Sequence, residues 1–312
     1  MLPPSLTLRA LTESGTLVLW RISTSKVLDL SPEASPKILG ILNATPDSFS
    51  DGGLWIDPRA AAEHAAEMIA EGAIGVDVGG ESTRPGATRV DAAGQIARVA
   101  PVIEATRRLV GGGPLITIDT TLAEVAEAAL NAGADAVNDV SGGTEDPAML
   151  GLVASRGCGV VLMHRRTTPE KDSYSTRYGK TGEHAPPTDE SDVVAVVRSA
   201  LATLVERALT CGVAREAIVI DPGLGFGKTV EQNLALVRRT RELIALGYPV
   251  MSGLSRKSFT ARAAGLPDDT LPAQRLDATV ALSREHRRAG ARLFRVHDVA
   301  AHTQAFAADS AG

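Results

Sequence analysis

The sequence predicts an α/β protein of the (β/α)8 class, a TIM barrel with a short N-terminal extension. Eight short apolar runs, each typical of a buried strand, alternate along the chain with segments of helical periodicity. The length of 312 residues suits such a barrel, which needs about 250 residues plus insertions. Polar side chains follow the apolar runs at their carboxyl ends, where barrels of this class place their active sites. Eight consecutive units favour a closed barrel over an open sheet.

Each expected strand is an apolar run bounded by turn residues, as in a parallel sheet that is covered on both faces. The expected strands are residues 38–42, 75–80, 115–119, 136–140, 159–164, 217–221, 249–254 and 292–298. The expected helices are residues 58–71, 91–110, 122–132, 146–156, 192–211, 231–246, 272–289 and a last helix that ends at about residue 308. The first helix begins at Pro58 and ends at Gly72, a common asymmetry of helix ends.

The chain shows no second domain and no linker between domains. Residues 1–36 carry no motif and are expected to form an N-terminal extension, whereas residues 37–312 are expected to form the barrel. Apolar and polar residues alternate in 6–10 and again in 16–21. This alternation predicts a short β-hairpin with its turn near Gly15, which would cover the bottom of the barrel.

Composition argues against several classes of protein. The hydrophobic content of 44% is ample for a core, and a net charge of -5 gives no bias toward nucleic acid or anionic membranes. Two cysteines, Cys158 and Cys211, indicate a reducing compartment rather than a disulfide framework. The apolar run 17–20 is too short for a signal peptide or a membrane span. We therefore expect a soluble, cytoplasmic protein.

The ends of the expected strands supply the candidate functional residues. The strand that ends at Asn43 opens into a polar loop that contains Asp51 and closes at Gly53. Any one polar residue at a strand end is as well explained by a helix cap or a buried turn. A polar residue at every strand end is improbable without a site. The full set is Asn43, Arg84, Asp119, Asn138, His164, Asp221, Lys257, Arg295 and His297.

The chemistry of part of this set suits a flat heterocycle. Acceptors on rigid strand ends match the adjacent N–H donors of a pterin or a purine, and we expect them from Asp119, Asn138 and Asp221. Lys257 offers donors to a ring carbonyl or ring nitrogen.

The remaining residues form a separate cationic group that suits phosphate oxygens. This group is Arg84, Arg295 and His297, with arginine favoured because its fork geometry matches phosphate. A heterocycle attached to a phosphorylated arm would satisfy both groups.

At these residues the sequence resembles the dihydropteroate synthase family. Residues 40–53 (Gly-Ile-Leu-Asn-Ala-Thr-Pro-Asp-Ser-Phe-Ser-Asp-Gly-Gly) and 77–86 (Asp-Val-Gly-Gly-Glu-Ser-Thr-Arg-Pro-Gly) are similar to its two signature segments. The later motifs occur in the family's order at residues 118–120, 137–140, 221–228, 255–257 and 295–299. The resemblance spans about residues 27–308, and seven ordered motifs are far more specific than a single pattern match.

The resemblance implies a reaction of folate biosynthesis. Members of the family join 4-aminobenzoate to 6-hydroxymethyl-7,8-dihydropterin diphosphate, with magnesium bound to the diphosphate, and release 7,8-dihydropteroate and pyrophosphate. The partners are thus two small molecules, with no nucleic acid and no membrane. The resemblance also implies a homodimer.

The resemblance also implies roles for individual residues. The pterin would be held by Asp119, Asn138, Met163, Asp221 and Lys257. The residues that flank 4-aminobenzoate would be Thr83, Pro85, Phe226 and Ser258. Asn43 would coordinate magnesium, and the diphosphate oxygens would be bound by Arg84, Arg295 and His297. Asp51 would order the first loop, so that the catalytic set becomes Asp51, Arg84, Lys257, Arg295 and His297.

Two alternative functions remain, and the chain departs from the family at one place. A methyltetrahydrofolate methyltransferase domain shares the barrel and the pterin pocket, but it has no diphosphate to bind. A non-catalytic or divergent pterin-binding paralogue is the second alternative. The departure follows Met163 and His164, where Arg165-Arg-Thr-Thr168 replaces the family's Met-x-Gly-like segment and opens a long loop, 165–190. We expect this loop on the catalytic face, as a basic lid over an anionic substrate or as an insertion without a role.

Overall fold

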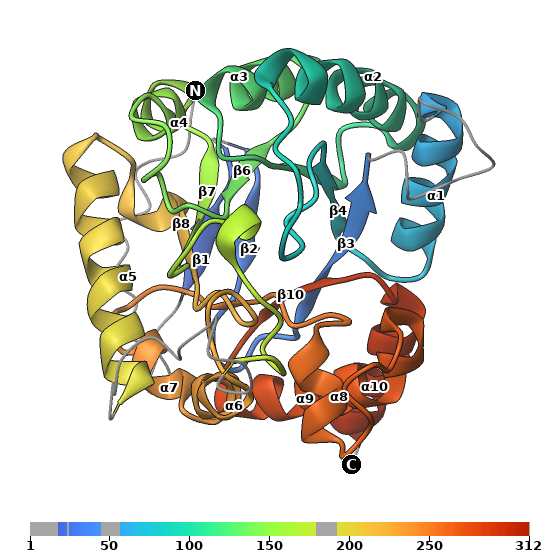
Figure 1. The fold of residues 1–312 in the computed structure, drawn as a ribbon. Helices are drawn as coiled ribbons and strands as arrows, with labels where there is room; N and C mark the ends of the chain where they lie inside the picture. Colours follow the sequence, from blue (N-terminus) through green and yellow to red (C-terminus); the bar gives the residue numbers. More distant parts are fainter. Residues whose placement is uncertain (1–17, 24, 45–56, 179–191, 312) are drawn as a thin grey trace.

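The computed structural model describes residues 18–23, 25–44, 57–178 and 192–311. Eight parallel strands form its central sheet: β3 (Lys37–Asn43), β4 (Gly75–Gly79), β5 (Leu115–Asp119), β6 (Ala136–Asp139), β7 (Gly159–Met163), β8 (Ile218–Asp221), β9 (Met251–Ser252) and β10 (Leu293–Val296). Their order is β8-β7-β6-β5-β4-β3-β10-β9, and a parallel bridge between Ile220 and Val250 joins the two edges. The helices surround the strands (Figure 1). The predicted TIM barrel is confirmed.

The outer ring contains helices that follow the barrel strands. They are α1 (Pro58–Ala70), α2 (Ala92–Val110), α3 (Ala123–Ala132), α4 (Met149–Arg156), α5 (Val193–Thr210), α6 (Val230–Arg238), α7 (Thr240–Ile244), α8 (Ser258–Ala263), α9 (Leu276–Ala289) and α10 (Val299–Ala311). Their caps follow from sequence: the Asp57 side chain accepts from Arg59 N at 2.9 Å at the start of α1, and Thr229 and Gln232 form a capping box on α6. None of the helices in the described ranges has both the length and the apolar character needed to span a bilayer.

A hairpin covers the amino-terminal end of the barrel, as expected, but its strands differ from the predicted ones. β1 (Leu19–Arg21) pairs antiparallel with β2 (Val27–Asp29), whereas the predicted first arm, 6–10, lies outside the described residues. Trp20 is fully buried and donates from Nε1 to Ala217 O at 3.0 Å. Residues of this hairpin pack in one cluster with residues of the barrel strands. The predicted division of the chain at residue 36 stays a prediction.

Three predicted elements differ in length or number. The predicted helix 231–246 is two helices, α6 and α7, because the backbone leaves the helical region at Arg239, whose guanidinium binds Asp192 Oδ1 at 2.8 Å and Glu242 Oε1 at 2.6 Å. The predicted strand 249–254 is reduced to the two residues of β9, and the six-residue α8 is too short to show a helical period in the sequence. The predicted helix 272–289 begins as a 3-10 turn, Pro272–Arg275.

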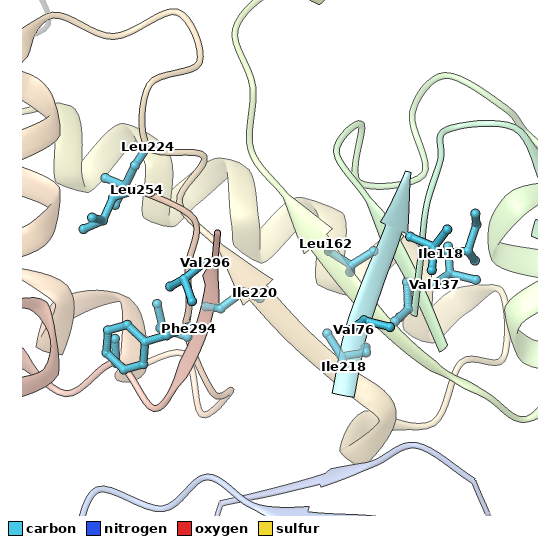
Figure 2. Packing of buried hydrophobic residues seen from close by; sticks show 14 of the residues in the cluster. Val76, Ile118, Val137, Leu162, Ile218, Ile220, Leu224, Leu254, Phe294 and Val296 are labelled. Atoms are coloured by element: carbon cyan, nitrogen blue, oxygen red, sulfur yellow. The ribbon is translucent and has the colours of Figure 1, made fainter. Parts of the chain in front are cut away.

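Side chains alternate across each strand, and this alternation creates an apolar outer layer and a mixed interior. Figure 2 shows outer-layer side chains, among them Val76, Ile118 and Phe294, of the cluster that packs against the helices. Inside the barrel, the layer nearest the hairpin is apolar and contains Leu39, Leu115, Ala136, Val161, Val219, Met251 and Leu293. The next interior residues along four of these strands are polar: Thr117, Asn138, Asp221 and Arg295. Together with Asp77 and Asp119 they form a polar layer beneath a cavity, and we call this layer the floor.

Candidate active site

A cavity of about 900 Å³ opens at the carboxyl ends of the barrel strands. Its walls bring together residues from seven different strands or the segments that follow them, which is the arrangement expected of a barrel active site. Ten of the predicted site residues line it: Asn43, Thr83, Arg84, Pro85, Asp119, Phe226, Lys257, Ser258, Arg295 and His297. Of the nine strand-end residues predicted to converge, six line this cavity, whereas Asn138, His164 and Asp221 do not.

The other predicted site residues lie deeper in the barrel or outside the residues that the structure describes. Asn138, Met163 and Asp221 are buried beneath the cavity wall. Asp221 is close to the wall, since a Cβ built on Gly253 would lie 3.2 Å from Asp221 Oδ2. Asp51 falls in 45–56, outside the described residues.

His164, a further strand-end candidate, is buried and does not line the cavity. Burial, followed by the nearby charges of Lys228 and Arg166, lowers the pKa of its imidazole. Its carbonyl oxygen lies 3.4 Å from Lys228 Nζ, so this residue helps to hold the loop after β8.

A buried carboxylate, Asp77, forms the centre of the cavity floor. Its side chain is 0% exposed, and it accepts hydrogen bonds from Thr117 Oγ1, from Arg295 Nε and, at 3.0 Å, from Asn138 Nδ2. The β4–β5 register sets Asp77 directly beside Thr117. Asp77 was not among the predicted site residues. The sequence could have indicated it, because Asp77 is a carboxylate within an otherwise apolar strand. A charge buried in this way requires partners.

Arg295 lies differently from its prediction as part of a separate cationic group. Its Nε donates to Asp77 and its Nη2 donates to Asp119 Oδ2 at 2.7 Å. Because residue 295 faces the barrel interior, its guanidinium enters a layer that already holds two carboxylates. Burial raises the pKa of Asp119, and Arg295 opposes that shift. The charge of Arg295 is therefore largely matched within the protein.

Asn138 has one fixed donor and one available acceptor. Its Nδ2 donates to Asp77, which sets the orientation of the amide. Its Oδ1 is buried and has no hydrogen-bond partner within the part of the chain that the structure describes. A buried acceptor without a partner is costly, so a ligand with an N–H donor suits this position.

Lys257 crosses the upper part of the cavity. Its Nζ donates to Leu224 O and lies 4.1 Å from the centroid of the Phe226 ring. Burial lowers the pKa of this lysine to about 8, although Asp221 opposes the shift. Gly225 permits the close approach, because its φ is +82° and a Cβ there would lie 2.6 Å from Lys257 Cδ.

His297 is a neutral hydrogen-bond donor rather than a cation. Burial, followed by Arg256 and Arg295, lowers the pKa of its imidazole to about 3. Its backbone N–H donates to Ser255 Oγ at 3.1 Å, so the Ser255 hydroxyl is available to donate to His297 Nδ1 at 3.0 Å. This pair of bonds favours the tautomer with the proton on Nε2. With this lowered pKa the imidazole is neutral at pH 7 in the protein alone, and its role in a group that binds phosphate stays a prediction.

Arg256 shapes the turn that carries Ser255 and Lys257, and it was also missed. Its φ of 57° is the one positive value for a non-glycine residue within the described ranges. That conformation costs about 1–2 kcal/mol. Arg256 Nε donates to Asp298 Oδ2 at 2.9 Å, and its backbone N donates to Thr279 Oγ1 at 3.3 Å. These bonds hold the strained turn and tie it to the loop that begins after His297.

Arg84 is the exposed cation of the cavity wall. Its loop is held from below, since Glu81 Oε1 accepts from Val90 N at 2.7 Å and lies 3.3 Å from Arg89 Nε. Arg89 also binds Glu145, which accepts from Arg165 at 2.5 Å. The loop that carries Arg84 is thus fixed by charges on the loops after β6 and β7.

Asn43 is positioned to offer an oxygen ligand. A Cβ built on Gly79 would lie 4.0 Å from Asn43 Oδ1 and 3.9 Å from Asp119 Oδ2, so both oxygens border the same small space. Among the described residues, no group of three or more His, Cys, Asp or Glu forms a metal cluster. Magnesium commonly takes one or two protein oxygens and completes its shell with substrate phosphates and water. Asn43 fits that pattern.

Comparison with known proteins agrees with this geometry. Residues 39–297 match the family described as pterin binding enzyme. The chain is 45% identical over 274 residues to the dihydropteroate synthase of Mycobacterium leprae, covering 87% of this chain and 92% of the relative. The Xanthomonas albilineans dihydropteroate synthase with 4-aminobenzoic acid has a TM-score of 0.81 at 37% identity, covering 95% and 98% of the two chains.

The same Xanthomonas albilineans enzyme in complex with 7,8-dihydropteroate has a TM-score of 0.76 at 35% identity and covers 91% and 95% of the two chains. These relatives are named as synthases and not as methyltransferases. The family match covers well over half of the chain, and the identity to the relative extends over most of both sequences. The chain belongs to the dihydropteroate synthase family of pterin-binding enzymes.

Proposed function

We propose that this protein condenses 6-hydroxymethyl-7,8-dihydropterin diphosphate with 4-aminobenzoate, giving 7,8-dihydropteroate and pyrophosphate. The observation that carries the proposal is the division of one cavity into two chemistries. Acceptors that include the unpartnered Asn138 Oδ1 lie in the floor, and the donors of Arg84, Lys257 and His297 line the cavity above it. A flat ring with N–H donors and an anionic arm matches that division.

The floor would hold the pterin ring. Asn138 Oδ1 and the Asp221 carboxylate would accept from the ring's N–H groups, and Lys257 would donate to a ring nitrogen or carbonyl. Met163 packs with Phe226 and Val140 in a small apolar cluster, which gives the ring an apolar face to lie on.

The mouth would hold the diphosphate. Arg84 would bind its oxygens with a charged fork, and His297 would donate from Nε2 as a neutral group. Asn43 would hold a magnesium ion carried by the diphosphate, and that ion would neutralise negative charge on the leaving group. Arg295 would act from the floor, because its guanidinium is bound to Asp77 and Asp119.

The reaction needs charge stabilisation and placement rather than a nucleophilic residue. The bond between the methylene carbon and the diphosphate oxygen breaks, and both electrons leave with pyrophosphate. The cation that forms is delocalised into the dihydropterin ring, where the carboxylates of Asp119 and Asp221 favour positive charge. The amine of 4-aminobenzoate then forms the carbon–nitrogen bond and loses a proton to water. Its placement would come from the loop residues Thr83, Pro85 and Phe226 and from Ser258 at the start of α8.

We also propose a homodimer in the cytoplasm. The dimer rests on the resemblance to the family, and the cytoplasm on the two cysteines, both of which are free. Light scattering on purified protein tests the dimer, and a monomer at micromolar concentration would contradict it.

A direct assay tests the reaction. Purified protein is mixed with dihydropterin diphosphate, 4-aminobenzoate and magnesium, and both dihydropteroate and pyrophosphate are measured. We expect the two products in equal amounts. Tight binding of the pterin substrate without product would instead identify the chain as a non-catalytic paralogue.

A further inference from the structure

The first half of the long loop after β7 is docked between two other loops of the site. Gly86 N, in the loop after β4, donates to Pro169 O at 2.8 Å. Arg89 Nη1 lies 3.7 Å from Glu170 Oε1. These contacts join the start of the segment 169–178 to the loop that carries Thr83 and Pro85.

The same segment is joined to the loop after β8. Both carboxylate oxygens of Asp172 accept from Gly227 N, at 3.2 and 3.0 Å, and Oδ1 also accepts from Tyr178 Oη. Asn233 adds a second link, because its Nδ2 donates to Ser175 Oγ at 3.1 Å while its Oδ1 accepts from Gly225 N at 2.6 Å. The buried residues of the segment are Pro169, Asp172, Ser173, Ser175 and Thr176.

One side chain of this segment reaches the cavity. Tyr174 lines it together with Phe226, Pro272 and Arg275, and no other described residue of 165–178 does so. Arg177 Cζ lies 5.2 Å from the centroid of the Tyr174 ring, and Arg177 N donates to Tyr174 O at 2.8 Å. Two of the basic residues predicted to form a lid do not line the cavity: Arg165 binds Glu145, and Lys171 is exposed. The remainder of the predicted lid, 179–190, lies outside the described residues and stays a prediction there.

We infer that Tyr174 is a specificity-determining residue for the arylamine substrate and that Asp172 is the positioning residue that fixes it against Phe226. The inference rests on the proposed function. Tyr174 and Phe226 both line the cavity, and Phe226 is proposed to flank 4-aminobenzoate, whereas Asn138 and Asp221, the acceptors proposed for the pterin, are buried and do not line it. A tyrosine ring provides a rigid aromatic surface, and Asp172 links its segment directly to the residue after Phe226.

This arrangement determines what the arylamine site accepts. An aromatic contact contributes a factor of about 2 to 10 in affinity beyond the area that it buries. We expect the ring also to limit the length of the arylamine, because a substituent that extends from the side opposite the amine toward Tyr174 would meet it. Because Asp172 accepts from backbone N–H groups, its loss would loosen the wall without removing any side chain that lines the cavity.

The experiment measures KM for both substrates and kcat in wild type, Tyr174→Ala, Tyr174→Phe and Asp172→Asn. We expect Tyr174→Ala to raise KM for 4-aminobenzoate about 2- to 10-fold, with kcat and KM for the dihydropterin diphosphate within twofold of wild type. Tyr174→Phe should restore the wild-type KM. Asp172→Asn should raise the same KM, by less than Tyr174→Ala, with the thermal midpoint measured alongside.

A longer arylamine, 4-aminobenzoylglycine, tests specificity. Its KM relative to that of 4-aminobenzoate should fall in Tyr174→Ala and stay at the wild-type ratio in Tyr174→Phe. Tyr248→Phe is the matched control, because it removes a tyrosine hydroxyl that binds Arg215 Nη1 at 2.7 Å and does not line the cavity. It should leave both KM values unchanged.

Calorimetry of 4-aminobenzoate in the presence of pyrophosphate separates this inference from the proposed function, since it requires no turnover. Weaker binding by Tyr174→Ala supports the inference even if the wild type makes no dihydropteroate, a result that would remove only the proposed function. Equal affinity for 4-aminobenzoate in wild type and Tyr174→Ala overturns the inference, whatever the turnover. So does an equal rise in KM for both substrates.

Discussion

The floor and the mouth of the cavity are built in different ways. The floor consists of strand residues, and Asp77, Thr117, Asn138, Asp119 and Arg295 are joined side chain to side chain across neighbouring strands. The mouth consists of loop residues, which are held mainly through backbone groups of other loops. The strand register fixes the floor, whereas each part of the mouth depends on a distant segment of the chain.

This difference teaches where affinity and specificity arise in the barrel. A floor of polar groups that bind one another is rigid, and its members depend on one another. A mouth assembled from loops adapts to a second substrate without disturbing the floor. Substitutions in the floor should therefore reduce stability and activity together, whereas those in the mouth should change activity alone.

Arg295→Ala should have the largest effect and tests the floor. The change leaves the buried carboxylates of Asp77 and Asp119 without the guanidinium that pairs with both of them. Breaking a buried pair in this way costs about 3–5 kcal/mol. Urea unfolding measures the loss, with Arg21→Ala as the control, since its pair with Glu216 is partly exposed and should change stability by less than about 1 kcal/mol. Equal midpoints for the two variants would contradict the buried pair.

Lys257→Ala tests the mouth. This residue lies on the turn after β9, and its loss removes a donor from the reacting region. We expect kcat to fall by about 10²–10³, because one contact that is stronger in the transition state contributes about 2.7–4 kcal/mol. The urea midpoint should change less than in Arg295→Ala. The control is Lys171→Ala, an exposed lysine of the docked segment, which should turn over like the wild type. A Lys257→Ala enzyme with normal turnover would remove this lysine from the mechanism.

A third pair of variants separates the two regions by ligand. Asp221→Asn leaves one acceptor oxygen where there were two, so affinity should fall even for a pterin without diphosphate. A cost of about 1–3 kcal/mol follows when a buried donor loses its acceptor. Asn43→Ala should leave the bare pterin unaffected and weaken the magnesium dependence of diphosphate binding. Calorimetry measures the affinity of both variants for both ligands. If the two variants lose affinity for the same ligands, floor and mouth do not bind separate parts of the substrate.

The residue types of the site could be predicted from the sequence, but their partners could not. The strand-end rule located Asn43, Asp119 and Lys257, because parallel strands bring their carboxyl ends together. Asp77 was missed because it lies inside a strand, and its three donors come from strands that are distant in sequence. The lowered pKa of His297 could not be predicted either, because it results from burial and from two arginines, and neither is visible in a motif.

The fold shows the same limit. Apolar periodicity located the barrel strands, but the break at Arg239 results from bonds to Asp192 and Glu242, which no local pattern reports. Tyr174 was placed in a predicted lid, and only the buried contacts of Asp172 show that its segment is docked. Long-range contacts decided each of these cases.

The last prediction compares a histidine of the mouth with one of the core, and its effect per pH unit is small. Burial lowers the pKa of both His297 and His286 to about 3, and His286 Nδ1 lies 2.8 Å from Ser252 Oγ behind the barrel wall. Below the unfolded pKa of about 6.5, the unfolded chain binds protons that the folded chain excludes. Each histidine therefore makes stability fall as pH is lowered from about 6.5 toward 3, by at most about 1.4 kcal/mol per pH unit.

The variants His286→Gln and His297→Gln test that comparison by urea unfolding and kinetics between pH 4 and 7. Both should reduce the slope of unfolding free energy against pH, because each removes one group that titrates only in the unfolded chain over this range. Only His297→Gln should also lower kcat/KM at pH 7, since it replaces a donor that lines the cavity whereas His286 packs against Phe294. A slope unchanged by His286→Gln would contradict its buried, neutral state. A drop in kcat/KM of equal size in both variants would mean that the core and the mouth are not separable at these positions.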